Sequence, residues 1–84
     1  MTYTLAQLPP GESGRVAALD FPPRKARRME DLGFPPGQQV PALHTPPFGG
    51  ITAYQVLDTV IALRDTDASR ITLYTLQDEK DDVL

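Results

Sequence analysis

The sequence predicts a small, mainly β domain in which five short strands curl into a barrel and one α-helix follows the first strand. Nine prolines and six glycines cut the 84 residues into short pieces, each too short for a long helix. Short β-rich runs recur between these breaks, and only one run has helical periodicity. So many strands in so short a chain must close on one another to protect their edges. The predicted strands span residues 14–21, 38–44, 51–57, 60–64 and 71–76.

Irregularities are predicted at several points along these strands. Apolar alternation slips by one residue at Ala18–Leu19, which predicts a bulge or bend in the first strand. Pro41 cannot donate to a ladder, so its strand is expected at an edge or in an irregular position. Asp58–Thr59 has the spacing of a two-residue hairpin. Before the first strand, residues 5–8 fit one helical turn, and residues 65–70 read as a polar turn.

One helix is predicted from Pro23 to Leu32. Proline suits the first helical position because its missing N–H has no partner there. Three apolar residues recur at three-residue spacing and form a face that should pack on the barrel. They are Ala26, Met29 and Leu32.

The residues after the helix predict how it ends. Gly33 should adopt the left-handed conformation, which lets Phe34 pack back on Met29. Pro36 and Gly37 then suit the central positions of a type II turn.

The charges of this helix run against the usual preference. Four of the five residues from Arg24 to Arg28 are cationic, whereas a helix favours acids at its start. Asp31 can pair with Arg27 or Arg28, and no residue before Pro23 offers a good N-cap. The helix start therefore predicts an anion-accepting surface for an acidic protein face, a phosphate group or nucleic acid. The alternative is that these are ordinary solvated charges.

Composition limits the other possibilities. The formal net charge is −3, and residues 78–84 alone contribute that charge, so we expect a domain over residues 1–77 and an acidic tail over 78–84. The absence of cysteine excludes disulfides and thiolate metal sites. No signal peptide or membrane span is visible, which predicts a cytoplasmic protein.

Four motifs, in this order, resemble the FeoA family of small bacterial ferrous-iron transport proteins. They are the opening "TLAQLPPGESGRV", the pair Arg27–Arg28 with "LGFPPG" after it, "ALR" at 62–64, and Ala68 with Ile71. The resemblance implies an SH3-like barrel with an added helix. It also implies a non-catalytic accessory protein that acts in the cytoplasm on FeoB, the inner-membrane ferrous-iron transporter with a GTP-binding domain.

The sequence departs from the family pattern at two places. Gly49-Gly50-Ile51 stands where the family usually has Gly-Asp-Pro, and Asp58 stands at a hairpin position commonly held by glycine. A similar barrel is appended to iron-responsive repressors. The alternative function is therefore an SH3-like metal-responsive regulatory domain that binds a transition metal ion directly.

The residues themselves predict no metal site, no cofactor and no catalysis. His44 is the single histidine and has no partner at ligand spacing, and Asp65 and Asp67 are better suited to capping their turn. No nucleophile lies beside a base. An acidic chain whose basic run lacks interleaved aromatic residues is also a poor nucleic-acid binder.

A partner-binding surface is the remaining prediction. It combines the basic helix with aromatic side chains, including one from the loop "TPPFGG", and a plug over one barrel end is the other interpretation of that loop. The expected partner is the cytoplasmic part of a FeoB-type membrane transporter, which would hold the protein at the inner face of the membrane without insertion. The predicted residues are Arg24, Lys25, Arg27, Arg28, Met29, Phe34 and Phe48.

Overall fold

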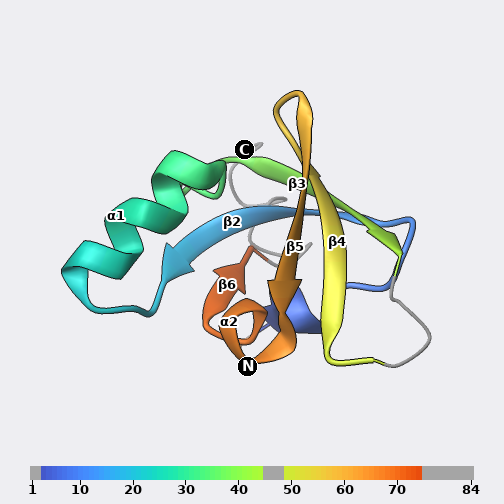
Figure 1. Cartoon of the computed structure of the whole chain (residues 1–84), viewed down its shortest axis with the longest axis horizontal. Helices are drawn as coiled ribbons and strands as arrows, with labels where there is room; N and C mark the ends of the chain where they lie inside the picture. Colours follow the sequence, from blue (N-terminus) through green and yellow to red (C-terminus); the bar gives the residue numbers. More distant parts are fainter. Residues whose placement is uncertain (1–2, 45–48, 75–84) are drawn as a thin grey trace, which may run out of the picture.

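The computed structural model describes residues 3–44 and 49–74 and shows one antiparallel sheet with a helix at its side (Figure 1). The sheet order is β1-β6-β2-β3-β4-β5. The strands are β1 (Tyr3–Thr4), β2 (Ser13–Leu19), β3 (Gln39–His44), β4 (Ile51–Val56), β5 (Thr59–Arg64) and β6 (Ile71–Leu73). The helices are η1 (Leu5–Gln7), α1 (Pro23–Leu32) and α2 (Asp65–Ala68).

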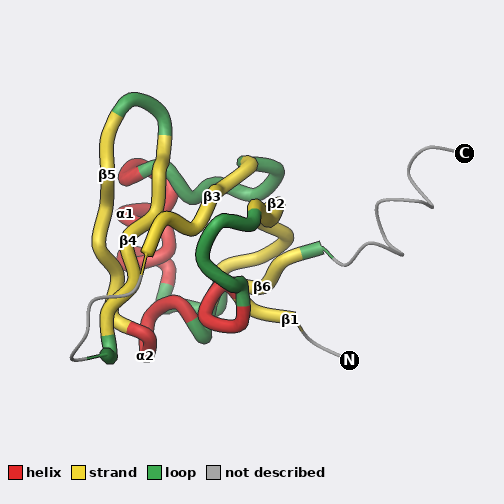
Figure 2. Tube along the Cα trace, turned by 90° about the vertical axis from the view of Figure 1, so that its right-hand side faces the viewer, coloured by secondary structure: helices red, strands yellow, loops and turns green. Residues whose placement is uncertain are grey.

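This architecture confirms the predicted fold class, a mainly β domain with one helix after its first long strand. The prediction of five strands missed β1, which has two residues and pairs with β6. Within the described residues the two end strands, β1 and β5, are not paired with each other, so hydrogen bonds do not close the sheet into a complete barrel. Helices α2 and η1 contact each other between these ends, as Figure 2 shows from the side.

The predicted irregularities fall close to their expected places. The register of β2 against β6 shifts between Val16 and Ala18, one step before the predicted slip. Pro41 lies in the middle of the sheet, where β3 changes from pairing with β2 to pairing with β4. Pro41 is itself paired with Ser13, and hydrogen bonds on the β2 side continue beyond it, from the Ala42 N–H to the Glu12 carbonyl at 2.9 Å. The strand is therefore not at an edge, and the irregularity next to Pro41 is the register shift of β3 against β4 between Ala42 and His44.

The β4–β5 hairpin has two turn residues, as predicted, but the turn is shifted by one residue. Val56 pairs with Thr59, so Leu57 and Asp58 form the turn, and the positive φ of 53° falls on Leu57. Burial explains the shift, because this register places Tyr54 and Val56 in the core. A one-residue slip would turn every side chain of a strand to the other face.

The core lies between the two halves of the curved sheet. Its largest fully buried side chains are Tyr54, Phe34, Leu5, Ile71, Val16, Val40 and Val56. Phe34 and Tyr54 meet edge to face with ring centroids 6.2 Å apart. The Tyr54 hydroxyl donates a hydrogen bond to the Leu5 carbonyl at 3.4 Å, so η1 is tied to the centre of the sheet.

Candidate functional site

Helix α1 begins and ends as its sequence predicts. Proline occupies its first position, and Pro22 before it provides no side-chain cap. Gly33 has a φ of 125°, and the Phe34 N–H donates to the Met29 carbonyl at 3.1 Å, which is the hydrogen bond of a Schellman termination. The turn that follows has the Gln38 N–H bonded to the Pro35 carbonyl, with Gly37 at φ 93°. The predicted type II turn is therefore confirmed.

The apolar face of α1 packs on the sheet less fully than its spacing predicts. Met29 is the one buried residue of the helix, whereas Ala26 is half-buried and Leu32 is 38% exposed. Figure 1 shows the helix standing beside the sheet, with its C-terminal end leading into β3. The helix is held by one buried side chain and by its termini.

A groove of about 550 Å³ separates α1 from β5 and α2. Its walls are mostly apolar carbon, from Met29 and Leu32 of the helix and Leu63 of β5. The groove is open to solvent along one side. Its lining residues are Pro22, Arg24, Lys25, Arg28, Met29, Leu32, Leu63 and Asp67.

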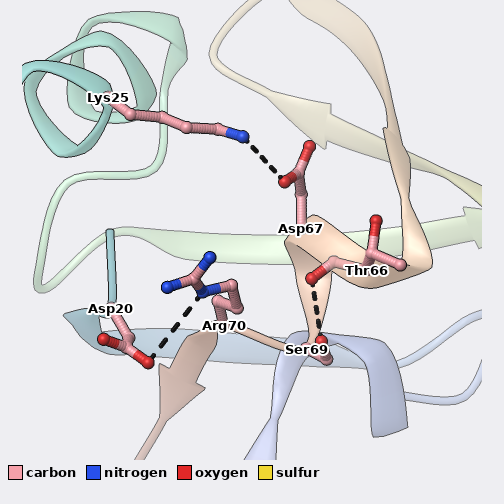
Figure 3. A network of polar contacts seen from close by, with 6 residues as sticks. All are labelled: Asp20, Lys25, Thr66, Asp67, Ser69 and Arg70. Atoms are coloured by element: carbon pink, nitrogen blue, oxygen red, sulfur yellow. Dashed lines mark hydrogen bonds and ion pairs between the residues drawn. The ribbon is translucent and has the colours of Figure 1, made fainter. Parts of the chain in front are cut away.

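One end of this groove is closed by an ion pair. The Lys25 Nζ atom lies 3.0 Å from the Asp67 carboxylate, and Figure 3 shows the lysine reaching from α1 across to α2. Phe21 lies beneath the same cation, with Nζ 5.3 Å from the ring centroid, and the Arg70 guanidinium lies 5.4 Å from that ring. Asp20 is 4.0 Å from Arg70. This cluster fixes the start of α1 against α2.

Three arginines of α1 have no such partner. Arg24, Arg27 and Arg28 are exposed, and none forms an ion pair or hydrogen bond with another described residue. The expected pair between Asp31 and Arg27 or Arg28 is not formed. The α1 surface therefore keeps three uncompensated positive charges, which a helix start does not favour. We call Arg24, Arg27 and Arg28 the basic face.

Three of the predicted partner-binding residues are less available to a partner than expected. Phe34, predicted to bind the partner, is fully buried in the core and does not contribute to a surface. Met29 is 4% exposed, so it anchors the helix and reaches a partner only as the floor of the groove. Lys25 is engaged by Asp67 and does not add a free charge. Phe48 lies outside the described residues.

Several residues that shape this site were not predicted to belong to it. Leu63 and Asp67 come from the far end of the chain, and Phe21 was assigned to a strand that ends two residues earlier. The Lys25–Asp67 pair joins residues 42 positions apart, beyond any local pattern. Asp67 therefore pairs with α1, and neither it nor Asp65 caps α2, whose N-cap is Arg64.

The described residues offer no assembled set of metal ligands. Among residues 3–44 and 49–74, no three histidine, aspartate or glutamate side chains lie close enough to hold one ion. His44 lies exposed at the end of β3, as expected from its position. In the same part of the chain, no helix is long and apolar enough to span a bilayer.

The fold and this surface define an SH3-like β domain with an added basic helix. The chain belongs to the FeoA family, because the family model described as the FeoA domain matches residues 3–74. No curated protein is similar enough in sequence to serve as a further guide.

Solved structures agree with this assignment. FeoA from Stenotrophomonas maltophilia is 33% identical, with a TM-score of 0.72 over 86% of this chain and 89% of that one. That structure is a zinc complex, described as a prokaryotic SH3 domain protein and a candidate activating factor for ferrous iron transport. FeoA from Chlorobium tepidum is 26% identical, with a TM-score of 0.79 over 88% of this chain and 70% of that one. A manganese-dependent transcriptional repressor shares the fold at 21% identity, with a TM-score of 0.74 over 89% of this chain and 42% of that one.

Proposed function

We propose that this protein is a non-catalytic accessory factor of ferrous iron transport, which docks through α1 to the cytoplasmic part of a FeoB-type transporter. It acts in the cytoplasm, at the inner face of the membrane. Family membership supports the link to iron transport, and the S. maltophilia relative is described in the same terms.

The observation that carries the docking site is the basic face. Three exposed arginines of α1 have no ion-pair or hydrogen-bond partner among the described residues, and Arg24 lies in the first turn, where the helix dipole is also positive. Two of them, Arg24 and Arg28, border the apolar groove. A charged rim around an apolar floor is the usual anatomy of a protein interface, because the rim steers association and the floor is desolvated on contact.

Charge reversal of the basic face tests this proposal. We expect Arg24→Glu with Arg28→Glu to weaken binding to the transporter's purified cytoplasmic domain at least tenfold, measured by titration calorimetry. The fold should survive because both side chains are exposed. An acid in the first turn of a helix is favoured by about 0.3–1 kcal/mol. This applies to position 24, whereas position 28 lies in the middle of α1, so the variant should be about as stable as the parent protein.

A matched pair of single variants separates local from overall charge. Arg28→Glu and Arg15→Glu change the net charge equally, but Arg15 lies on β2. Only the α1 variant should lose affinity, and affinity should fall with added salt. Equal loss in both variants, or no loss in either, would contradict docking through the basic face.

Direct metal binding is the second candidate, and the zinc complex of the S. maltophilia relative favours it. The described residues do not supply a convergent set of three ligands for such an ion. Anaerobic calorimetry with Fe(II) and with Zn(II) tests this function. Saturable binding at one site would support it, and the absence of binding heat with both ions would remove it.

A further inference from the structure

Strand β5 leaves one of its edges without a partner. It is the last strand in the sheet order, and no described strand pairs with its outer side. Val56 and Thr59 close the two-residue turn, and hydrogen-bonded pairs alternate along an antiparallel ladder. Thr59 and every second residue after it therefore point their backbone groups toward β4. The residues whose N–H and C=O groups point outward are Val60, Ala62 and Arg64.

Among the described residues, this edge lacks the usual protection against pairing. Natural edge strands are blunted by lysine, proline, bulges or covering segments. The pairing of β4 with β5 is regular over six residues, and the centre of β5 reads Val60-Ile61-Ala62 without a charge. Val60 is 54% exposed and Ala62 is also exposed. The edge is therefore accessible to another extended chain.

Helix α1 lies across the groove from β5. At one end Lys25 reaches Asp67, which follows β5 by three residues. At the other end Gly33 lies against Val56, the residue paired with the start of β5. Between these ends, the groove has Leu63 of β5 as one wall and Met29 and Leu32 of α1 as the other. Leu63 links the free edge to the apolar groove, because its side chain lines the groove and it lies between Ala62 and Arg64, whose N–H groups point away from β4.

We propose that this surface binds an extended segment of a partner protein, which adds to β5 as a further antiparallel or parallel strand. Alternate side chains of such a strand point to opposite faces. The side chains of one face would enter the groove, with apolar ones against Leu63 and acidic ones against Arg24 and Arg28, which line the same groove. The recognised chemistry is a strand that combines leucine or valine with aspartate or glutamate.

Charge complementarity favours an acidic segment of a partner protein over a second copy of this chain. Pairing two β5 edges would bring two basic faces toward each other, and those arginines have no acid partners among the described residues. An acidic strand compensates them instead. The inference rests on the proposed function for its choice of surface, but it specifies a binding mode that the docking proposal does not require.

The test uses the full chain labelled for NMR and a synthetic peptide of about ten residues. Every second residue of the peptide is leucine or glutamate, so that both kinds of side chain lie on one face, and threonine fills the positions between them. We expect binding to slow hydrogen exchange at the outward amides of Val60, Ala62 and Arg64, with no change at Thr59 or Ile61. A peptide with the same side chains but N-methylated at alternate residues should bind at least tenfold more weakly. Replacing glutamate with lysine should abolish binding.

A protein variant provides the complementary test. Ala62→Pro removes one outward N–H and leaves the hydrogen bonds between β4 and β5 intact. It should therefore lower the affinity for the peptide while the NMR signals of the sheet stay unchanged. If the N-methylated peptide binds as tightly as the unmodified one, strand addition is overturned. It is also overturned if the outward amides of β5 are already protected from exchange in the free protein because two copies associate. If the Arg24→Glu, Arg28→Glu variant loses the transporter but the peptide leaves β5 unprotected, this inference fails and the docking proposal stands.

Discussion

The sheet and the helix of this protein are stabilised to very different degrees. The sheet surrounds a core in which seven large side chains are fully buried, and η1, β3 and β4 all contribute to it. Helix α1 contributes one buried side chain, Met29, and lies beside a groove that is open to solvent. The comparison indicates that the sheet carries the stability while the helix presents charge. Charges that do not stabilise their own helix are expected at a binding site.

The largest expected loss of stability comes from a substitution in the core. Phe34→Ala removes a fully buried ring that meets Tyr54 edge to face, and it should lower the free energy of unfolding by about 3–5 kcal/mol. Urea denaturation gives this value directly. The control is Arg27→Ala on the exposed side of α1, for which we expect a change within about 0.5 kcal/mol. Similar losses in both variants would contradict the division between sheet and helix.

The second largest loss of stability is expected at Gly33, where α1 joins the core of the sheet. Gly33 has φ 125°, and an added Cβ would lie 2.9 Å from the Cβ of Val56. Gly33→Ala therefore combines backbone strain with overpacking, for a loss of about 2–4 kcal/mol in the free energy of unfolding. Gly37 also has a positive φ but has open space around it. Gly37→Ala should cost less, and an equal cost would show that contact with Val56 is unimportant.

The hairpin offers a gain in stability. Leu57 is 67% exposed and has a φ of 53°, a conformation that costs a non-glycine residue about 1–2 kcal/mol. Leu57→Gly should relieve most of this strain and raise the urea midpoint. Asp58→Gly is the matched control, since Asp58 does not have a positive φ. If only the Asp58 variant is stabilised, the observed hairpin register is wrong.

The smallest effect concerns pH. Burial raises the pKa of the Tyr54 hydroxyl above its ordinary value of 10.0, with a further contribution from the negative charge of Asp65. The unfolded chain therefore loses this proton at lower pH than the folded protein, and stability falls as pH rises above about 10. Denaturation curves across this range should show a shallower decline for Tyr54→Phe. An unchanged decline would assign the effect to other groups.

Local features of the fold were predictable from the sequence, because their causes lie within a few residues. Pro23 and Gly33 mark the ends of α1, and Pro36–Gly37 marks the turn after it. The hairpin register was missed because burial of Tyr54 and Val56 outweighs the turn preference of Asp58.

The site was predictable only in part. The basic face is visible in the chain as a run of cations against the helix dipole. The groove depends on Leu63 and Asp67, which the fold brings to α1 from more than thirty residues away. The prediction that Phe34 contacts a partner was wrong, because the ring is fully buried in the core and meets Tyr54 edge to face. Tyr54 lies twenty residues further along the chain, so this contact depends on the tertiary fold.

The most direct test of the account measures stability and binding on one variant. Arg24→Glu with Arg28→Glu should leave the free energy of unfolding within about 1 kcal/mol of the parent value, because only position 24 lies in the first turn of α1, where an acid is favoured. The same protein should bind the transporter's cytoplasmic domain at least tenfold more weakly. Full binding by a stable variant, or loss of binding accompanied by loss of the fold, would contradict the claim that the basic face of α1 serves recognition and not stability.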